Sequence, residues 1–203
     1  MTDIYKTVQN YRNLFISQIS GDCLVMTREK NWYILYVMGG KEKKICDFLG
    51  KEANWEVFTP FKEVVHKVNG ERVLVKKLLF PSYVFIETAL MPADFRQKIL
   101  SKRLQIQGIL RELKYEEDVS ALTEKEQAYL SKLMNDSKVV SLSKGEIIDG
   151  KVMITEGPLI GYESYIKKID RHKRRAILEV EINGNIMEVN VSLEIVKKIE
   201  SEK

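Results

Sequence analysis

The chain has 203 residues, of which 44% are hydrophobic and 31% charged, and its formal net charge is +4. This length suits one large or two small domains. Two cysteines, Cys23 and Cys46, without paired spacing exclude a disulfide scaffold and a zinc ribbon. No apolar run approaches the roughly 20 residues of a spanning helix, and no secretory signal opens the chain. We therefore expect a soluble cytoplasmic protein, whose charge permits a nucleic-acid partner without requiring one.

Residues 1–29 are expected to form an N-terminal extension of uncertain order. Val8, Tyr11, Phe15 and Ile19 fall on one helical face, which indicates a short amphipathic helix. Met26 directly precedes the first clear strand pattern and is a second candidate for the natural start of the protein.

Residues 30–134 interleave strand and helix patterns, which predicts one sheet with helices packed on it. Asn69-Gly70 separates two strand patterns and predicts a hairpin, because a type I′ turn needs positive φ at both central residues. Pro81 should be the first residue of a buried strand, since proline donates no ladder hydrogen bond. Thr123 and Glu126 form a capping-box pattern. Strands are expected at 32–38, 55–59, 64–68, 71–75 and 79–86, and helices around 45–49, at 91–100 and at 123–134.

The last third of the chain has a different sequence pattern. Residues 135–143 are polar and predict a linker. Beyond them, residues 144–203 carry short alternating strands, with a second Asn-Gly turn at Asn183-Gly184. Short strands in such close succession predict a small all-β barrel. They are expected at 151–155, 165–169, 176–182, 185–191 and 195–196.

Both halves resemble the NusG family of bacterial transcription elongation factors. Trp32-Tyr33, Gly40, Glu42 and Phe80-Pro81-Ser82-Tyr83-Val84 are similar to the family's N-terminal (NGN) domain, and the stretch from Gly157 to Ser164 is similar to its KOW motif. The resemblance covers about residues 30–200 in order. It implies an α+β NGN-like domain, with a mixed or antiparallel sheet flanked by helices, joined by a linker to a KOW barrel.

Two positions depart from the family pattern. The family usually has glycine where this chain has Ser82 and Ser164. Glycine is normally chosen for backbone freedom or close approach, so the two local turns are expected to differ. The departures favour a specialised paralog over the housekeeping member, with an antiterminator of long biosynthetic operons, of the LoaP type, as the best match.

The resemblance implies that the N-terminal domain binds the clamp helices of the largest RNA polymerase subunit through an apolar pocket. An exposed apolar patch with a polar rim is typical of a protein-binding site. Without the resemblance, ordinary core positions are the favoured interpretation of the same residues. By position in the motif, the pocket would be lined by Tyr33, Phe80, Pro81, Tyr83, Phe85 and Ile99.

A basic turn in the second half is the candidate RNA-binding site. Six cations surround a single Asp170, and such a local cluster can neutralise several phosphates. Arginine can also stack on bases or grip phosphate with two donors, which suits an RNA loop or bulge. The alternative is a solvated turn that keeps the protein soluble. The set is Lys167, Lys168, Arg171, His172, Lys173, Arg174 and Arg175, extended by Lys197 and Lys198.

A weaker third candidate comprises cations of the hairpin and of the second helix. In the resembled family the corresponding face meets upstream DNA or the non-template strand, while a solvated helix face explains the residues about as well. They are Lys67, Arg72, Lys76, Lys77, Arg96, Lys98, Lys102 and Arg103.

The sequence contains no glycine-rich phosphate loop, nucleophile elbow or metal constellation, so we expect no enzyme, cofactor or metal. The leading hypothesis is a processive antitermination factor that binds RNA polymerase and a nascent RNA hairpin. Non-template DNA and, through the KOW domain, a ribosomal protein or a termination factor are further expected partners. Two alternatives stay open: a ribosome-associated KOW-type RNA-binding protein, and a general elongation factor without RNA preference.

Overall fold

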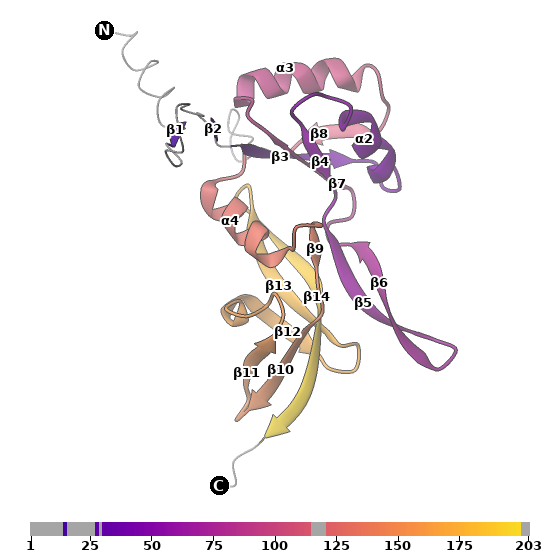
Figure 1. Ribbon diagram of the computed structural model, residues 1–203, viewed down its shortest axis with the longest axis vertical. Coiled ribbons are helices and arrows are strands. Elements are labelled where there is room, and N and C mark those ends of the chain that lie inside the picture. The colour runs from indigo at the N-terminus through magenta and orange to yellow at the C-terminus, as the bar shows by residue number, and fades with distance from the viewer. Residues whose placement is uncertain (1–13, 16–26, 29, 115–120, 200–203) are drawn as a thin grey trace, which may run out of the picture.

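The computed structural model describes residues 14–15, 27–28, 30–114 and 121–199 (Figure 1). β1 (Leu14–Phe15) pairs antiparallel with β2 (Thr27–Arg28), so Phe15 is extended there rather than helical. Val8, Tyr11 and Ile19 of the expected N-terminal helix lie outside the described residues, as does Met26.

A four-stranded antiparallel sheet, with strand order β4-β7-β3-β8, forms the centre of the first unit. Helices cover both faces, with α2 and α3 on one and α4 on the other, as Figure 1 shows. This mixed arrangement confirms the expected α+β class. The strands are β3 (Asn31–Val37), β4 (Glu56–Phe58), β7 (Tyr83–Thr88) and β8 (Ile109–Glu112), and the helices are α2 (Glu42–Leu49), α3 (Pro92–Arg103) and α4 (Glu124–Leu133).

Alternation along β3 divides its side chains between two hydrophobic cores, because successive strand residues point to opposite faces. Tyr33 packs beneath α2 and α3 together with Phe95. Trp32 and Ile34 pack on the other face, toward α4. Both central strands therefore contact protein on each side, which explains their near-continuous apolar sequence.

The predicted hairpin is present and is longer than its sequence pattern. β5 (Phe61–Val68) and β6 (Glu71–Leu78) pair throughout, with Val68 opposite Glu71. Asn69 and Gly70 have φ values of 51° and 88°, as a type I′ turn requires. A short strand, β9 (Val139–Val140), adds in parallel to β5. The hairpin projects from the first unit alongside the second (Figure 1).

The strand expected to open at Pro81 begins at Tyr83 instead, so Pro81 lies in the turn before it. In this turn Ser82 has φ 69°, the left-handed conformation that glycine adopts without strain. The Ser82 backbone N–H donates to Oε1 of the buried Glu42 at 2.9 Å, which fixes the turn against α2. Ser164 lies in the 3₁₀ turn η1 (Glu163–Tyr165) and has no positive φ. Only the first of the two serines therefore occupies a conformation that calls for glycine.

Replacing Ser82 with glycine is expected to stabilise the protein by about 0.5–1 kcal/mol. Relief of left-handed strain gives roughly 1–2 kcal/mol, and the added freedom of the unfolded chain offsets part of it. Ser164→Gly is the matched control, and it should destabilise slightly because its backbone gains nothing from glycine. Urea unfolding curves measure both changes, and equal losses for the two variants would contradict the prediction.

The second unit is one five-stranded sheet with strand order β11-β10-β14-β13-β12. β10 pairs parallel to β14 and the other neighbours pair antiparallel. Asn183 and Gly184 make the predicted hairpin turn, with φ values of 48° and 68°. No pairing among the described residues joins β11 to β12, so the expected closure into a barrel is not confirmed. The strands are β10 (Ser143–Ile148), β11 (Lys151–Glu156), β12 (Ile166–Asp170), β13 (Arg175–Ile182) and β14 (Asn185–Ile199).

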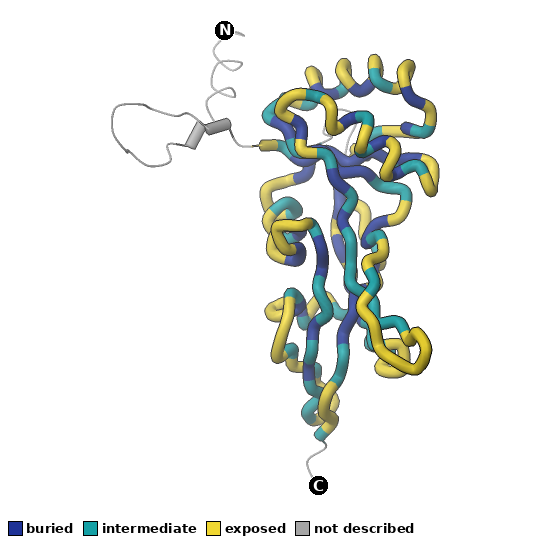
Figure 2. Tube along the Cα trace, turned by 45° about the vertical axis from the view of Figure 1, so that its right-hand side comes forward, coloured by how far each residue is buried: buried dark blue, intermediate teal, exposed yellow. Residues whose placement is uncertain are grey.

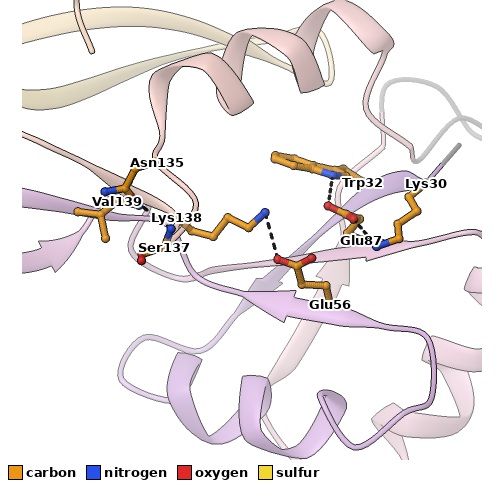
Figure 3. Close-up of polar contacts among 8 residues, drawn as sticks. All are labelled: Lys30, Trp32, Glu56, Glu87, Asn135, Ser137, Lys138 and Val139. Atoms are coloured by element: carbon orange, nitrogen blue, oxygen red, sulfur yellow. Dashed lines mark hydrogen bonds and ion pairs between the residues drawn. The ribbon is translucent and has the colours of Figure 1, made fainter. Parts of the chain in front are cut away.

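Residues 135–143, expected as a linker, hold β9 and the start of β10. Asn135 Oδ1 accepts hydrogen bonds from the backbone N–H groups of Ser137 and Val139, both at 3.0 Å (Figure 3). Lys138 Nζ lies 3.1 Å from Glu56 Oε1 and 4.6 Å from the Phe58 ring centroid. The segment therefore binds to the edge of the first sheet instead of spanning solvent.

Helix α4 joins the two units. Its capping box is present as predicted, with Thr123 Oγ1 accepting from Glu126 N and Glu126 Oε2 accepting from Thr123 N at 2.7 Å. Glu126 Oε1 also accepts from the backbone N–H of Asn183 at 2.6 Å, and the Tyr162 hydroxyl donates to the carbonyl of Tyr129 at 2.8 Å. One hydrophobic core runs from the first sheet through α4 into the second unit (Figure 2). No helix within the described ranges is both long enough and apolar enough to cross a membrane.

Candidate protein-binding and nucleic-acid-binding surfaces

The residues expected to line one apolar pocket lie on two faces of the first sheet. Tyr33 and Ile99 are in the core beneath α2 and α3, where the Tyr33 ring stacks on Phe95 with centroids 3.8 Å apart. Phe80 and Phe85 are in the opposite core and are only 2% and 1% exposed. These burials match the core interpretation of the four side chains. Of the expected set, Pro81 is exposed and Tyr83 is half-buried.

Tyr36 is the partner of Tyr83 that the sequence analysis missed. The two residues are directly opposite in the β3–β7 ladder, and their ring centroids are 5.4 Å apart. The guanidinium carbon of Arg111 lies 5.6 Å from the Tyr36 centroid. Strand alternation would have identified Tyr36, because it shares a face with Ile34 and not with Tyr33. We call Tyr36, Pro81, Tyr83 and Arg111 the tyrosine patch.

The predicted basic turn connects β12 to β13 and is closed by Asp170. Its Oδ1 accepts from the Lys173 backbone N–H at 3.0 Å, and its Oδ2 lies 3.5 Å from Arg175 Nη2. The Lys173 backbone hydrogen bond and the nearby cations lower the pKa of Asp170. Arg171, His172 and Lys173 are exposed at the tip of the turn. The carboxylate therefore supports the turn, and the cations beyond it face solvent.

The structure does not bring every expected cation to this tip. Lys167 Nζ lies 2.8 Å from both Glu179 and Glu188, and these two carboxylates raise the pKa of Lys167. Lys197 and Lys198 belong to the part of β14 that pairs with β10, whereas β13 and the turn lie beside residues 185–192. Lys167 is thus compensated, and the two C-terminal lysines lie farther along the sheet.

The hairpin cations approach the basic turn. Arg72 Nη1 lies 3.6 Å from Glu194 Oε1, and the same oxygen accepts from Arg174 Nε at 3.0 Å. One carboxylate of β14 therefore links the hairpin to the turn. Lys67, Lys76 and Lys77 are exposed on the same hairpin.

The cations expected on the second helix are engaged within the fold. Lys98 and Lys102 both pair with Glu52, and Lys98 lies over Trp55 at 5.4 Å. Arg103 donates to the Leu110 carbonyl at 3.0 Å, and Arg96 also has an interaction within the protein. By contrast, a hollow of about 740 Å³ beside α2 is lined by lysines that the sequence analysis did not select: Lys41, Lys43, Lys44 and Lys51.

Comparison with known proteins places this arrangement in a family. The α+β unit matches a family model described as "Transcription termination factor nusG" over residues 30–130. A Rickettsia felis protein named "Transcription termination/antitermination protein NusG" is 28% identical over 195 residues, which cover 90% of this chain and 99% of that protein. Identically named proteins of Rickettsia typhi and Pasteurella multocida are 29% and 23% identical and cover 83% and 85% of this chain, with 90% and 97% of their own lengths matched. The chain belongs to the NusG family.

Proposed function

We propose that this protein is a cytoplasmic transcription factor that binds RNA polymerase through its first unit and RNA through its second. The observation that carries the proposal is the correspondence to NusG-named proteins across both units, up to 99% of a relative's length. A match that covered the first unit alone would give no support for a function of the basic turn, which lies in the second unit.

The tyrosine patch is the proposed contact with the clamp helices of the largest polymerase subunit. Tyr36 and Tyr83 are half-buried and rest on the core that contains Phe80 and Phe85. Partly exposed aromatic side chains on a rigid base lose little conformational entropy on binding, which makes them suitable anchors. Arg111 adds a cation at the rim.

The finer proposal is processive antitermination on selected operons. By binding preferentially to a pause-resistant state of the clamp, the first unit would shift the polymerase population toward that state. The basic turn would capture a nascent RNA hairpin, and attachment through two units raises the effective concentration of each. The exposed Arg171 and Lys173 support the RNA assignment, and contacts with non-template DNA and with a ribosomal protein or termination factor belong to the same proposal.

Tyr36→Ala and Tyr83→Ala are each expected to weaken polymerase binding by at least tenfold, the order expected for an aromatic anchor. Affinity for purified core polymerase, measured by biolayer interferometry, tests this expectation. Tyr165→Ala is the matched control, because Tyr165 is 47% exposed but lies in the second unit. Circular dichroism would establish that each variant is folded, and wild-type affinity in folded Tyr36→Ala and Tyr83→Ala proteins would refute the docking role.

A further inference from the structure

A cluster of cations lies where the hairpin crosses the outer face of the second sheet. Lys62 and Lys77 are directly opposite in the β5–β6 ladder. Lys62 Nζ donates to the carbonyl of Asn190 in β14 at 2.6 Å. Ser192, also in β14, donates through Oγ to the carbonyl of Glu63 at 2.5 Å and is directly opposite Arg175. These contacts bring Lys62, Lys77 and Arg175 together from both units.

The charge of this cluster is poorly compensated. Asp170 lies 3.5 Å from Arg175 Nη2, but Arg175 Nε is buried without a hydrogen-bond partner among the described residues. Lys77 is exposed, and no carboxylate in the described part of the chain pairs with it. Burial, and then the charges of Lys77 and Arg175, lower the pKa of Lys62. Converging like charges and an unpaired buried donor both cost free energy, and a bound anion would remove both costs.

The cluster continues into the surfaces already described. Lys168 is opposite Ile177, which shares the outer face of β13 with Arg175 because the two are two positions apart in the strand. On the other side, Glu194 links Arg72 of the hairpin to Arg174 of the basic turn. In both Figure 1 and Figure 2 the hairpin lies alongside the second sheet. The cations therefore follow one path across the boundary between the units.

We propose that Lys62, Lys77 and Arg175 together bind a backbone phosphate of RNA, so that the RNA-binding surface is assembled from both units. This inference rests on the proposed RNA-binding function and adds to it a specific phosphate site. The Arg175 guanidinium offers its unpaired Nε–H beside Nη2, and the two ammonium groups add point charges. The site exists only while the hairpin rests on β13 and β14, so bound RNA stabilises the contact between the units.

The test uses the full chain and a fluorescein-labelled RNA hairpin with an internal bulge, followed by fluorescence anisotropy at several salt concentrations. Lys77→Gln is the main variant, because Lys77 makes no hydrogen bond or ion pair between the units among the described residues. We expect about fivefold weaker binding and a salt slope reduced by about 1, the signature of one lost phosphate contact. Lys167→Gln is the control; it removes the same charge from a lysine that Glu179 and Glu188 already compensate, and should leave affinity unchanged.

A double-mutant cycle tests whether one phosphate is shared. The double variant Lys77→Gln, Arg175→Gln should lose less RNA affinity than the product of the fold losses of the two single variants. A loss equal to that product would overturn the shared site. If Lys77→Gln binds RNA like the unmodified chain while reversal of Arg171 and Lys173 abolishes binding, the composite site is wrong and the RNA-binding function stands. If the unmodified chain shows no salt-dependent RNA binding, the function itself fails. If Lys77→Gln weakens binding to a DNA duplex of the same sequence but leaves binding to RNA unchanged, the RNA assignment is overturned.

Discussion

Replacing Phe80 with alanine is expected to destabilise the protein by about 3–5 kcal/mol, the usual cost of removing a buried phenylalanine. Phe80 is 2% exposed, and its ring centroid lies 5.6 Å from that of Phe85. Phe85 in turn packs against Phe58 and Trp32, so the cavity left by alanine would be surrounded by rigid rings that cannot close it. Guanidinium unfolding monitored by tryptophan fluorescence measures the loss.

Pro81→Ala is the control for this experiment, since the neighbouring proline is exposed and precedes the strand. Its effect on stability should stay within about 1 kcal/mol. The sequence analysis placed Phe80 in the docking pocket, where its loss would weaken polymerase binding rather than the fold. A Phe80→Ala protein with wild-type stability that no longer binds polymerase would restore that interpretation.

Local sequence patterns correctly predicted those turns and helix starts that are determined by neighbouring residues. Asn69-Gly70 and Asn183-Gly184 specify their turns through positive φ, and the Thr123–Glu126 box specifies a helix start through its own hydrogen bonds. Strand β10 was missed because its first residues, Ser143 to Glu146, are not apolar and its partner β14 is distant in sequence. Gly145 permits the close pairing of β10 with β11, since a Cβ there would lie 2.7 Å from the Met153 carbonyl oxygen.

The prediction of the docking surface was limited because it did not consider which face of the sheet each side chain occupies. A family motif orders residues along the chain but does not state which face each side chain occupies, so Tyr33 and Ile99 were grouped with Tyr83. Period-two alternation separates them and selects Tyr36. The register that places Tyr36 opposite Tyr83 joins strands about 50 residues apart, and such a register follows from packing rather than from local sequence.

Electrostatic partners were the least predictable part of the candidate sites. Lys167 looked like a free cation because Glu179 and Glu188 come from two other strands. The sequence analysis did not select Lys62, since a single lysine in an alternating strand is common. Its significance depends on Lys77 across the hairpin and Arg175 in the other unit, which meet only after the units pack together. Which cations stay uncompensated is therefore a property of the tertiary structure.

Reversing the exposed cations of the basic turn, with Lys168→Glu, Arg171→Glu and Lys173→Glu combined, is expected to weaken binding of the bulged RNA hairpin by at least ~100-fold at 100 mM salt. Each reversal removes a phosphate contact and adds repulsion, and such effects multiply for a polyanion. Fluorescence anisotropy measures the affinity. Arg174 and Arg175 are left unchanged, because they pair with Glu194 and Asp170, and reversing them would also break these ion pairs within the second unit.

The control is a variant with the same change in net charge elsewhere: Lys44→Glu, Lys51→Glu and Lys125→Glu, all exposed in the first unit. Long-range electrostatics are screened beyond about 8–10 Å at these salt concentrations, so this variant should lose only a few-fold in affinity. Equal losses for the two triple variants would mean that net charge governs binding and that the turn has no special role. A large loss confined to the turn would instead tie RNA affinity to the few cations that Asp170 holds in place while leaving them open to solvent.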